Sequence, residues 1–127
     1  MIRTIGLSAV LVLVGLATAG PVSAAVPKKK TELTLSYMAD AGFAAAVVLR
    51  CDPAGGPHPK KGKACAALAK ADGKPAKLKP TAGMCTMEYA PITAEITGRW
   101  QGRKVNWKKQ YGNPCEMHRA TGIVLAF

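Results

Sequence analysis

The sequence predicts an α+β fold: a five-stranded antiparallel sheet with two short helices and two disulfides. Five segments have the length and apolar pattern of strands, and too few helical segments separate them to provide the crossovers of a parallel sheet. Four cysteines fall in a chain of 127 residues whose N-terminus carries an export signal. Small exported domains are commonly held together by disulfides, because their cores are modest.

The N-terminus has the features of a cleaved signal peptide. Arg3 provides a positive start, and Ile5–Thr18 is almost entirely apolar. A membrane-spanning helix needs about twenty such residues, so an anchor is the less favoured interpretation. Small residues after Pro21 fit cleavage after Ala24 or Ala25. We expect a signal peptide over residues 1–24, a disordered basic tail over 25–30, and a secreted, extracellular domain over 31–127.

The first two strands are expected on either side of a turn. Thr31–Met38 alternates apolar and polar residues, which is typical of a half-buried strand. Asp40 and Gly42 mark the turn. Phe43–Cys51 is a continuous apolar run, and its valines favour a strand over the helix that its alanines also allow.

The middle of the chain alternates loops with one helix. Asp52–Lys63 holds three prolines and three glycines, which exclude a helix or a central strand. Ala64–Ala71 has high helix propensity, and Asp72-Gly73 supplies its stop signal. Lys74–Gly83 is a second polar, proline-broken loop.

The C-terminal third is predicted to contain a hairpin and a last strand. Ile92–Trp100 and Arg103–Tyr111 both alternate, and Gln101-Gly102 between them is a tight connection. Gly112–Gly122 is expected to be a loop with room for one helical turn. Ile123–Phe127 is a short apolar run, which we interpret as the fifth strand.

The four cysteines predict two disulfides, with three pairings left open by their spacing: Cys51, Cys65, Cys85 and Cys115. A zinc site is the weaker alternative. No C-x-x-C pair occurs, and His58 and His118 stand at no recognisable ligand spacing. We therefore expect no metal and no cofactor.

Residues that would support catalysis are sparse. The seven acidic residues show no pairing suited to acid–base chemistry, and Ser36 is the only serine after the signal peptide. The glycine-rich "DPAGGP" at Asp52–Pro57 lacks the strand–loop–helix context and the Lys-Ser/Thr ending of a phosphate-binding loop. The sequence therefore argues against an enzyme.

The chain is strongly basic, with a formal net charge of +11. The lysines are clustered, as in "PKKK", "KKGK" and "KADGKPAKLK". Binding of a polyanion is one interpretation, and a solvated surface that keeps the protein soluble is the other. Aromatic residues make up 6% and do not accompany the lysines, so a nucleic-acid partner is not expected.

The stretch "TAGMCTMEYAP", Thr81–Pro91, has the properties of a protease inhibitor's reactive loop. Such a loop enters the protease cleft in extended form and pairs with it as an added strand. Cys85 can anchor the loop two residues before Met87, and Pro91 stiffens it beyond Glu88. Met87 is an adaptable apolar side chain suited to a roomy apolar pocket. The alternative is a disulfide beside ordinary core methionines.

The wider sequence resembles the Streptomyces subtilisin inhibitor family of secreted serine protease inhibitors. The resemblance covers roughly Leu33 to Phe127 and rests on several motifs in one order. They are "LRCDPAGGPHPKKGKACAALA", "GMCTMEYAPI", "GRWQGRKVNW", "NPCEM" and the terminal "AF".

The resemblance implies a substrate-like, reversible inhibitor of subtilisin-like proteases, with trypsin-like enzymes as a second target class. It implies a homodimer formed through the sheet, disulfides Cys51–Cys65 and Cys85–Cys115, and a reactive bond between Met87 and Glu88. Asn113 matches a position that braces the loop, together with Cys115. The implied reactive loop consists of Met84, Cys85, Thr86, Met87, Glu88, Tyr89, Ala90 and Pro91.

Two departures from the family pattern bear on activity. Thr86 stands where proline is usual, and Glu88 stands where an apolar or small residue is more common. Threonine favours extended backbone but is less rigid than proline. These departures and the lysine excess keep a second hypothesis open, an extracellular module that binds a polyanion or the cell wall and whose reactive loop has decayed.

Overall fold

The structure is a computed structural model that describes residues 15–18, 20 and 29–127. Most of the predicted signal peptide, and residues 25–28 of the predicted tail, lie outside the described residues. The domain contains β1 (Thr31–Ala39), β2 (Ala44–Cys51), α1 (Lys61–Lys70), β3 (Ile92–Trp100), β4 (Arg103–Tyr111) and α2 (Pro114–Thr121). Two 3₁₀ turns, η1 (Pro75–Lys77) and η2 (Gly122–Leu125), complete it. No helix in this described part has the length and apolar character needed to cross a bilayer.

The sheet is antiparallel, with strand order β2-β1-β3-β4. Its strands lie within one residue of the predicted bounds. In β1 and β3 the predicted alternation reflects one buried face: Leu33 and Leu35 of β1 and Ile92 and Ile96 of β3 are fully buried. Between β3 and β4, Gln101 and Gly102 both have positive φ, 47° and 80°. This is the type I′ geometry that matches the twist of a hairpin.

The predicted fifth strand is wrong, because the described residues form four strands and Gly122–Leu125 is the 3₁₀ turn η2. Val124 and Leu125 are consecutive and both fully buried, whereas a strand added to this sheet would turn one of them to the uncovered face. Side chains, not a neighbouring strand, contact backbone carbonyls of this segment. The carbonyl of Val124 lies 2.9 Å from His58 Nε2, and Tyr37 Oη donates to the carbonyl of Phe127 at 2.8 Å. A short apolar run does not distinguish a strand from a buried helical turn.

The segment expected to be a loop with room for one helical turn contains the eight-residue helix α2. Asn113 caps it, Pro114 occupies its first turn, and Glu116 follows three residues after the cap. This is a sequence signature of a helix start. In contrast, α1 begins at Lys61, three residues before the predicted Ala64, without a side-chain cap.

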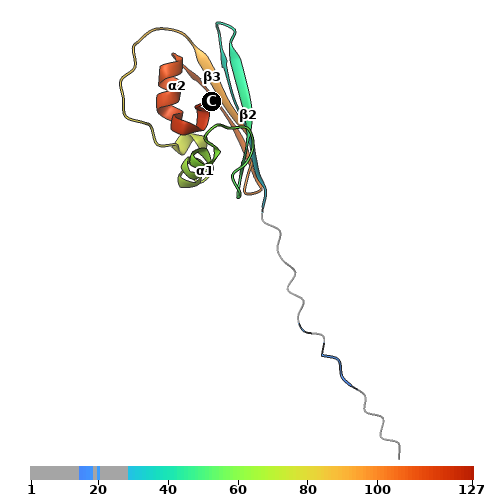
Figure 1. Cartoon of the computed structure of the whole chain (residues 1–127). Helices are drawn as coiled ribbons and strands as arrows, with labels where there is room; N and C mark the ends of the chain where they lie inside the picture. The colour runs from blue at the N-terminus through green and yellow to red at the C-terminus, as the bar shows by residue number, and fades with distance from the viewer. Residues whose placement is uncertain (1–14, 19, 21–28) are drawn as a thin grey trace, which may run out of the picture.

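The core lies between the inner face of the sheet and the helical layer. Figure 1 shows α1 and α2 on the same side of the sheet. Leu68 of α1 and Met117 of α2 are fully buried there. The Cys51–Cys65 disulfide joins the end of β2 to α1. No helix or loop of the described residues covers the opposite face of the sheet, so that face is open to solvent.

Candidate functional site

The segment from Thr81 to Pro91 is an extended loop without helix or strand hydrogen bonding. In Figure 1 it arcs away from the domain between the 3₁₀ turn η1 and β3. Three large apolar side chains stand in solvent on it: Met87 is 98% exposed, Met84 is 97% exposed and Tyr89 is 87% exposed. These methionines are therefore not core residues, and a cluster of exposed apolar side chains marks an interaction site.

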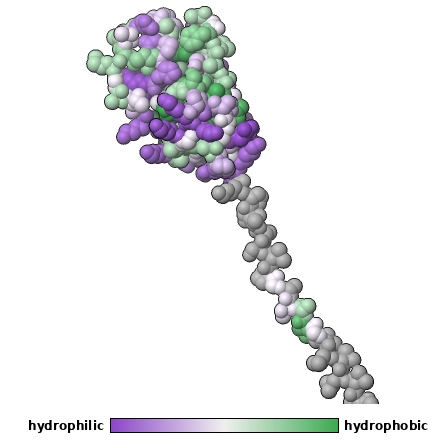
Figure 2. Space-filling view, viewed as in Figure 1, coloured by the Kyte–Doolittle hydropathy of each residue, from purple (hydrophilic) through white to green (hydrophobic). Residues whose placement is uncertain are grey.

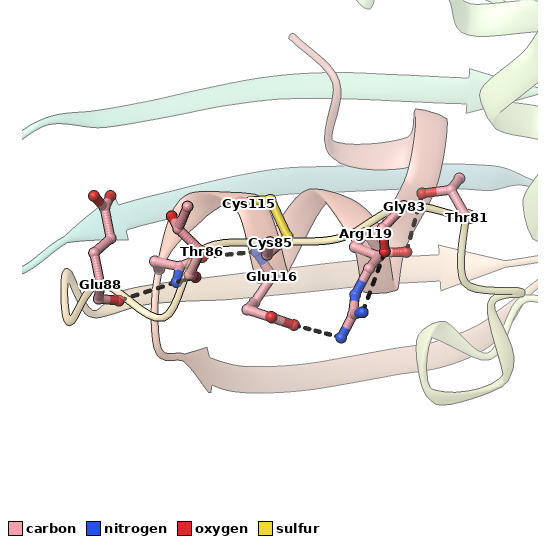
Figure 3. The surroundings of a disulfide bond; sticks show 9 residues. Thr81, Gly83, Cys85, Thr86, Glu88, Cys115, Glu116 and Arg119 are labelled. Carbon is pink, nitrogen blue, oxygen red and sulfur yellow. Dashed lines mark hydrogen bonds and ion pairs between the residues drawn. A yellow bond between two sulfur atoms is a disulfide. The ribbon is translucent and has the colours of Figure 1, made fainter.

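A disulfide fixes the first half of the loop to α2. Cys85 is bonded to Cys115, the second residue of α2, and their Cα atoms are 5.8 Å apart. Figure 3 shows the loop running alongside α2 with this bridge between them. Both pairings that the resemblance implies, this one and Cys51–Cys65, are present in the structure.

The side chain of Asn113 holds the loop on both sides of Met87. Its Nδ2 group donates to the carbonyl of Thr86 at 3.1 Å and to the carbonyl of Glu88 at 3.0 Å. Asn113 is only 3% exposed, so water competes little for these two bonds. The backbone around Met87 is therefore fixed while its side chain stays free.

The same side chain also starts α2. Asn113 Oδ1 accepts a hydrogen bond from the backbone N–H of Glu116 at 2.9 Å, the usual function of an N-cap. The amide thus uses its acceptor for the helix and both donors for the loop. Formation of the helix therefore orients the group that supports the loop.

Beyond Glu88, backbone hydrogen bonds hold the chain. The N–H of Ala90 donates to the carbonyl of Gly112 at 2.8 Å, and the N–H of Asp40 donates to the carbonyl of Pro91 at 2.9 Å. Gly112 directly precedes Asn113, so the support again comes from the start of α2. The loop enters β3 already fixed in direction.

Arg119 secures the beginning of the loop, which the sequence did not lead us to expect. Its carbonyl accepts from the N–H of Thr81 at 2.9 Å, and its guanidinium makes a longer bond of 3.4 Å to the carbonyl of Gly83. Glu116 Oε2 lies 2.7 Å from Arg119 Nη2 (Figure 3). The i,i+3 spacing of Glu116 and Arg119 indicates a helix ion pair, but nothing in it points to Gly83.

The titratable groups near the loop are few among the described residues. No group of three His, Cys, Asp or Glu side chains lies close enough together there to hold a metal ion. The carboxylate of Glu88 has no ion-pair partner in the described part of the chain. Burial raises the pKa of Tyr111, at the end of β4, so its phenol stays neutral. The arrangement presents an extended peptide segment whose largest side chains are exposed.

Comparison with known proteins identifies the family. A family model described as subtilisin inhibitor-like matches residues 28–113. Subtilisin inhibitor-like protein 1 of Streptomyces cacaoi is 45% identical over 98 residues, covering 74% of this chain and 89% of that protein. The subtilase-type protease inhibitor of Streptomyces coelicolor is 36% identical over 135 residues, covering 98% and 94%.

A solved structure shares the fold. Sermetstatin of Streptomyces caespitosus, crystallised in complex with Bacillus licheniformis subtilisin, aligns with a TM-score of 0.64 and 27% identity. The alignment covers 77% of this chain and 99% of sermetstatin. The relatives named here are inhibitors, and the family match spans most of the chain, so this protein belongs to the subtilisin inhibitor-like family.

Proposed function

We propose that this protein is a substrate-like, reversible and tight-binding inhibitor of subtilisin-type serine endopeptidases, and not an enzyme. The observation that carries the proposal is the loop around Met87: its side chain is 98% exposed, while buried Asn113 holds the carbonyls on both sides. Met87 would be the specificity residue and Met87–Glu88 the reactive bond. The sermetstatin–subtilisin complex supports a serine protease as the partner.

Binding follows from the shape of the loop. Residues near Met87 are extended and free of internal sheet pairing, so their backbone can pair with the protease as an added strand. The methionine then enters an apolar pocket. Because Cys85 and Asn113 already fix the backbone, association loses little conformational entropy.

Reversibility follows from the supports on both sides of the bond. If the protease cuts after Met87, the acyl end stays tied through Cys85–Cys115. The new amine end stays tied through Glu88 to Asn113 and through Ala90 to Gly112. Because the two ends remain together, resynthesis competes with release and the protein inhibits instead of being consumed.

Specificity would depend on Met87 and its neighbours. Met87→Lys should shift inhibition towards trypsin-like enzymes, because a cation suits their acidic pocket, and the fold should be unaffected because Met87 packs against nothing. Inhibition constants for subtilisin and trypsin, with thermal unfolding as the control, measure this. An unchanged target profile would show that Met87 is not the specificity residue.

The secreted location and the domain limits belong to the same proposal. The features of residues 1–24 and the two disulfides both fit export into an oxidising environment. The inhibitor domain would then be residues 31–127, following a basic tail over 25–30, with no membrane attachment after cleavage. Mass spectrometry of the secreted protein would locate the cut at Ala24 or Ala25.

A homodimer through the uncovered sheet face completes the proposal. The helices lie on the other face, and Met38 is 63% exposed here beside Ser36, Ala46 and Thr93. A second copy would bury these small and apolar groups. Sedimentation should show a dimer that Met38→Glu converts to a monomer, whereas a monomeric native protein would contradict this part.

Titration of subtilisin with the oxidised mature protein, using a small chromogenic substrate, tests the function. We expect stoichiometric inhibition, and mass spectrometry should find slow scission at Met87–Glu88 alone. Rapid degradation without inhibition would instead support the decayed-loop hypothesis. In that case substitutions of Met87 would leave binding of a polyanion or the cell wall unchanged.

A further inference from the structure

The lysines of the domain concentrate on one surface away from the reactive bond. Residues 60–79 contain seven lysines and one aspartate, so over half of the net charge of +11 lies in twenty residues. The aspartate, Asp72, is already within ion-pair distance of Lys74 and Arg103. Among the described residues no carboxylate pairs with the remaining six, which are Lys60, Lys61, Lys63, Lys70, Lys77 and Lys79.

Four of these lysines line a single groove of about 560 Å³, which we call the lysine groove. Lys63 and Lys70 lie on one face of α1, seven residues apart. Lys77 and Lys79 come from η1 and the loop after it, so cations line the groove from two separate segments. All four are exposed, and the remaining lining is mostly apolar, including Ala67 and Ile123.

The lysines at the start of α1 lower the stability of this helix. A helix N-terminus favours acidic residues, but the first turn of α1 has none and instead holds Lys61 and Lys63 next to the cap Lys60. Like charges three residues apart also repel. A sequence that breaks local stability rules without a structural gain indicates a function for the residues concerned.

The lysine groove reaches the loop only at its first residue, Thr81, six positions before Met87. In Figure 1 the loop leaves the region of η1 and α1 and arcs towards the far end of the sheet. Figure 2 shows hydrophilic residues gathered over the end of the domain that bears α1. A ligand in the groove would therefore leave Met87 accessible.

We propose that the lysine groove binds a linear phosphate polymer. Its cations are all lysines, whereas the described arginines lie elsewhere. Lysine ammonium groups bind phosphate as point charges, without the fixed bidentate geometry that arginine imposes on phosphate and carboxylate alike. Cations from two segments suit a flexible chain with repeating charge. The inference does not depend on the inhibitory role, and it would give the protein a means of being retained at a phosphate-rich surface.

The test compares two variants of equal net charge. K63Q/K70Q/K77Q/K79Q removes the groove cations, and K29Q/K104Q/K108Q/K109Q removes four cations from the N-terminal side and β4. Binding of labelled inorganic polyphosphate and of poly(glycerol phosphate) is followed by fluorescence anisotropy at several salt concentrations. Poly-glutamate serves as the carboxylate polymer, and circular dichroism confirms folding.

For the native protein, release of counterions from four phosphates predicts a log–log salt slope of about −3, an affinity loss of about 50-fold between 50 and 200 mM salt. The groove variant, K63Q/K70Q/K77Q/K79Q, should lose most of this binding and most of the salt dependence. The control variant, K29Q/K104Q/K108Q/K109Q, should keep both. Equal loss in the two variants, absent binding at low salt, or equal preference for poly-glutamate would each overturn the proposal. Subtilisin inhibition by the groove variant should equal that of the native protein, since none of its substitutions lies in the loop.

Discussion

The two helices cover the same face of the sheet but differ in how they begin and in what they hold. α2 has an asparagine cap, a proline in its first turn and Glu116 close behind, and it contacts the reactive loop along its length. α1 has no side-chain cap and no acid in its first turn, and its disulfide ends on β2. Both helices contribute a buried residue to the core, but α2 also supports the loop, whereas α1 presents cations to solvent.

The largest expected effect comes from removing one disulfide at a time. Without Cys85–Cys115, the loop loses its anchor to α2, and re-ordering even two residues costs about 2–4 kcal/mol. C85S/C115S should therefore bind subtilisin about 100-fold more weakly and be cleaved quickly at Met87–Glu88. Inhibition constants and the rate of scission measure this.

The matched control is C51S/C65S, which removes the disulfide of α1. Loop-closure entropy predicts comparable losses of stability, about 3 kcal/mol for the 14-residue separation and about 4 kcal/mol for the 30-residue one. Measured below its melting temperature, C51S/C65S should still inhibit. If both variants lose inhibition equally while folded, the special role of α2 is wrong.

Asn113→Asp separates the two functions of the cap. Aspartate caps a helix as well as asparagine does, so α2 should persist. The two donors to Thr86 and Glu88 are lost, each worth about 1 kcal/mol, and a buried carboxylate oxygen would face the two carbonyl oxygens instead, so inhibition should weaken by at least about 30-fold. Asn113→Ala should weaken inhibition similarly and also lower stability. Unchanged inhibition by the aspartate variant would remove Asn113 from the loop support.

Arg119→Gln should have a smaller effect. It breaks an exposed ion pair with Glu116 and a long bond to Gly83, and such exposed contacts contribute about 0.2–1 kcal/mol. We expect inhibition to weaken by no more than about fivefold, with faster scission of Met87–Glu88. Glu116→Gln, which leaves Arg119 in place, should have part of this effect. A change in melting temperature with no change in scission would mean that Arg119 supports only the helix.

Lys60→Ser should leave inhibition unchanged. Serine can provide the side-chain cap that α1 lacks, which should stabilise the domain by about 0.5–1 kcal/mol in chemical denaturation. The backbone N–H of residue 60 still donates to His58 Nδ1 in this variant. Altered inhibition would show that α1, and not α2 alone, influences the loop.

Three of the four strands, β1, β3 and β4, could be predicted because each shows its buried face as alternation in its own sequence, whereas β2 is predicted from a continuous apolar run. The alternation in Ile92–Trp100 and Arg103–Tyr111 fixes both strands and the turn between them. The last apolar run failed because its environment decides its shape: His58 and Tyr37 take its carbonyls, and consecutive residues are buried. No local pattern reports those long-range contacts.

The candidate site divides in the same way. The local sequence indicates the anchor at Cys85, but it leaves open whether Met87 is exposed or in the core, and the structure decides for exposure. The spacing of Asn113 and Glu116 is a helix-start signature that the prediction of a loop over Gly112–Gly122 did not use. The interpretation of Asn113 as a loop support came from resemblance alone. The contacts of Arg119 with Thr81 and Gly83 join residues more than thirty positions apart, so only the folded structure reveals them.

The most direct test of the central claim is to start from protein already cut at Met87–Glu88. The cut protein is incubated with a catalytic amount of subtilisin, and mass spectrometry follows the intact form over time. If α2 holds both ends in place, the cut form should inhibit and the intact bond should reappear until the two forms reach equilibrium. Cut protein that neither inhibits nor religates would contradict the account.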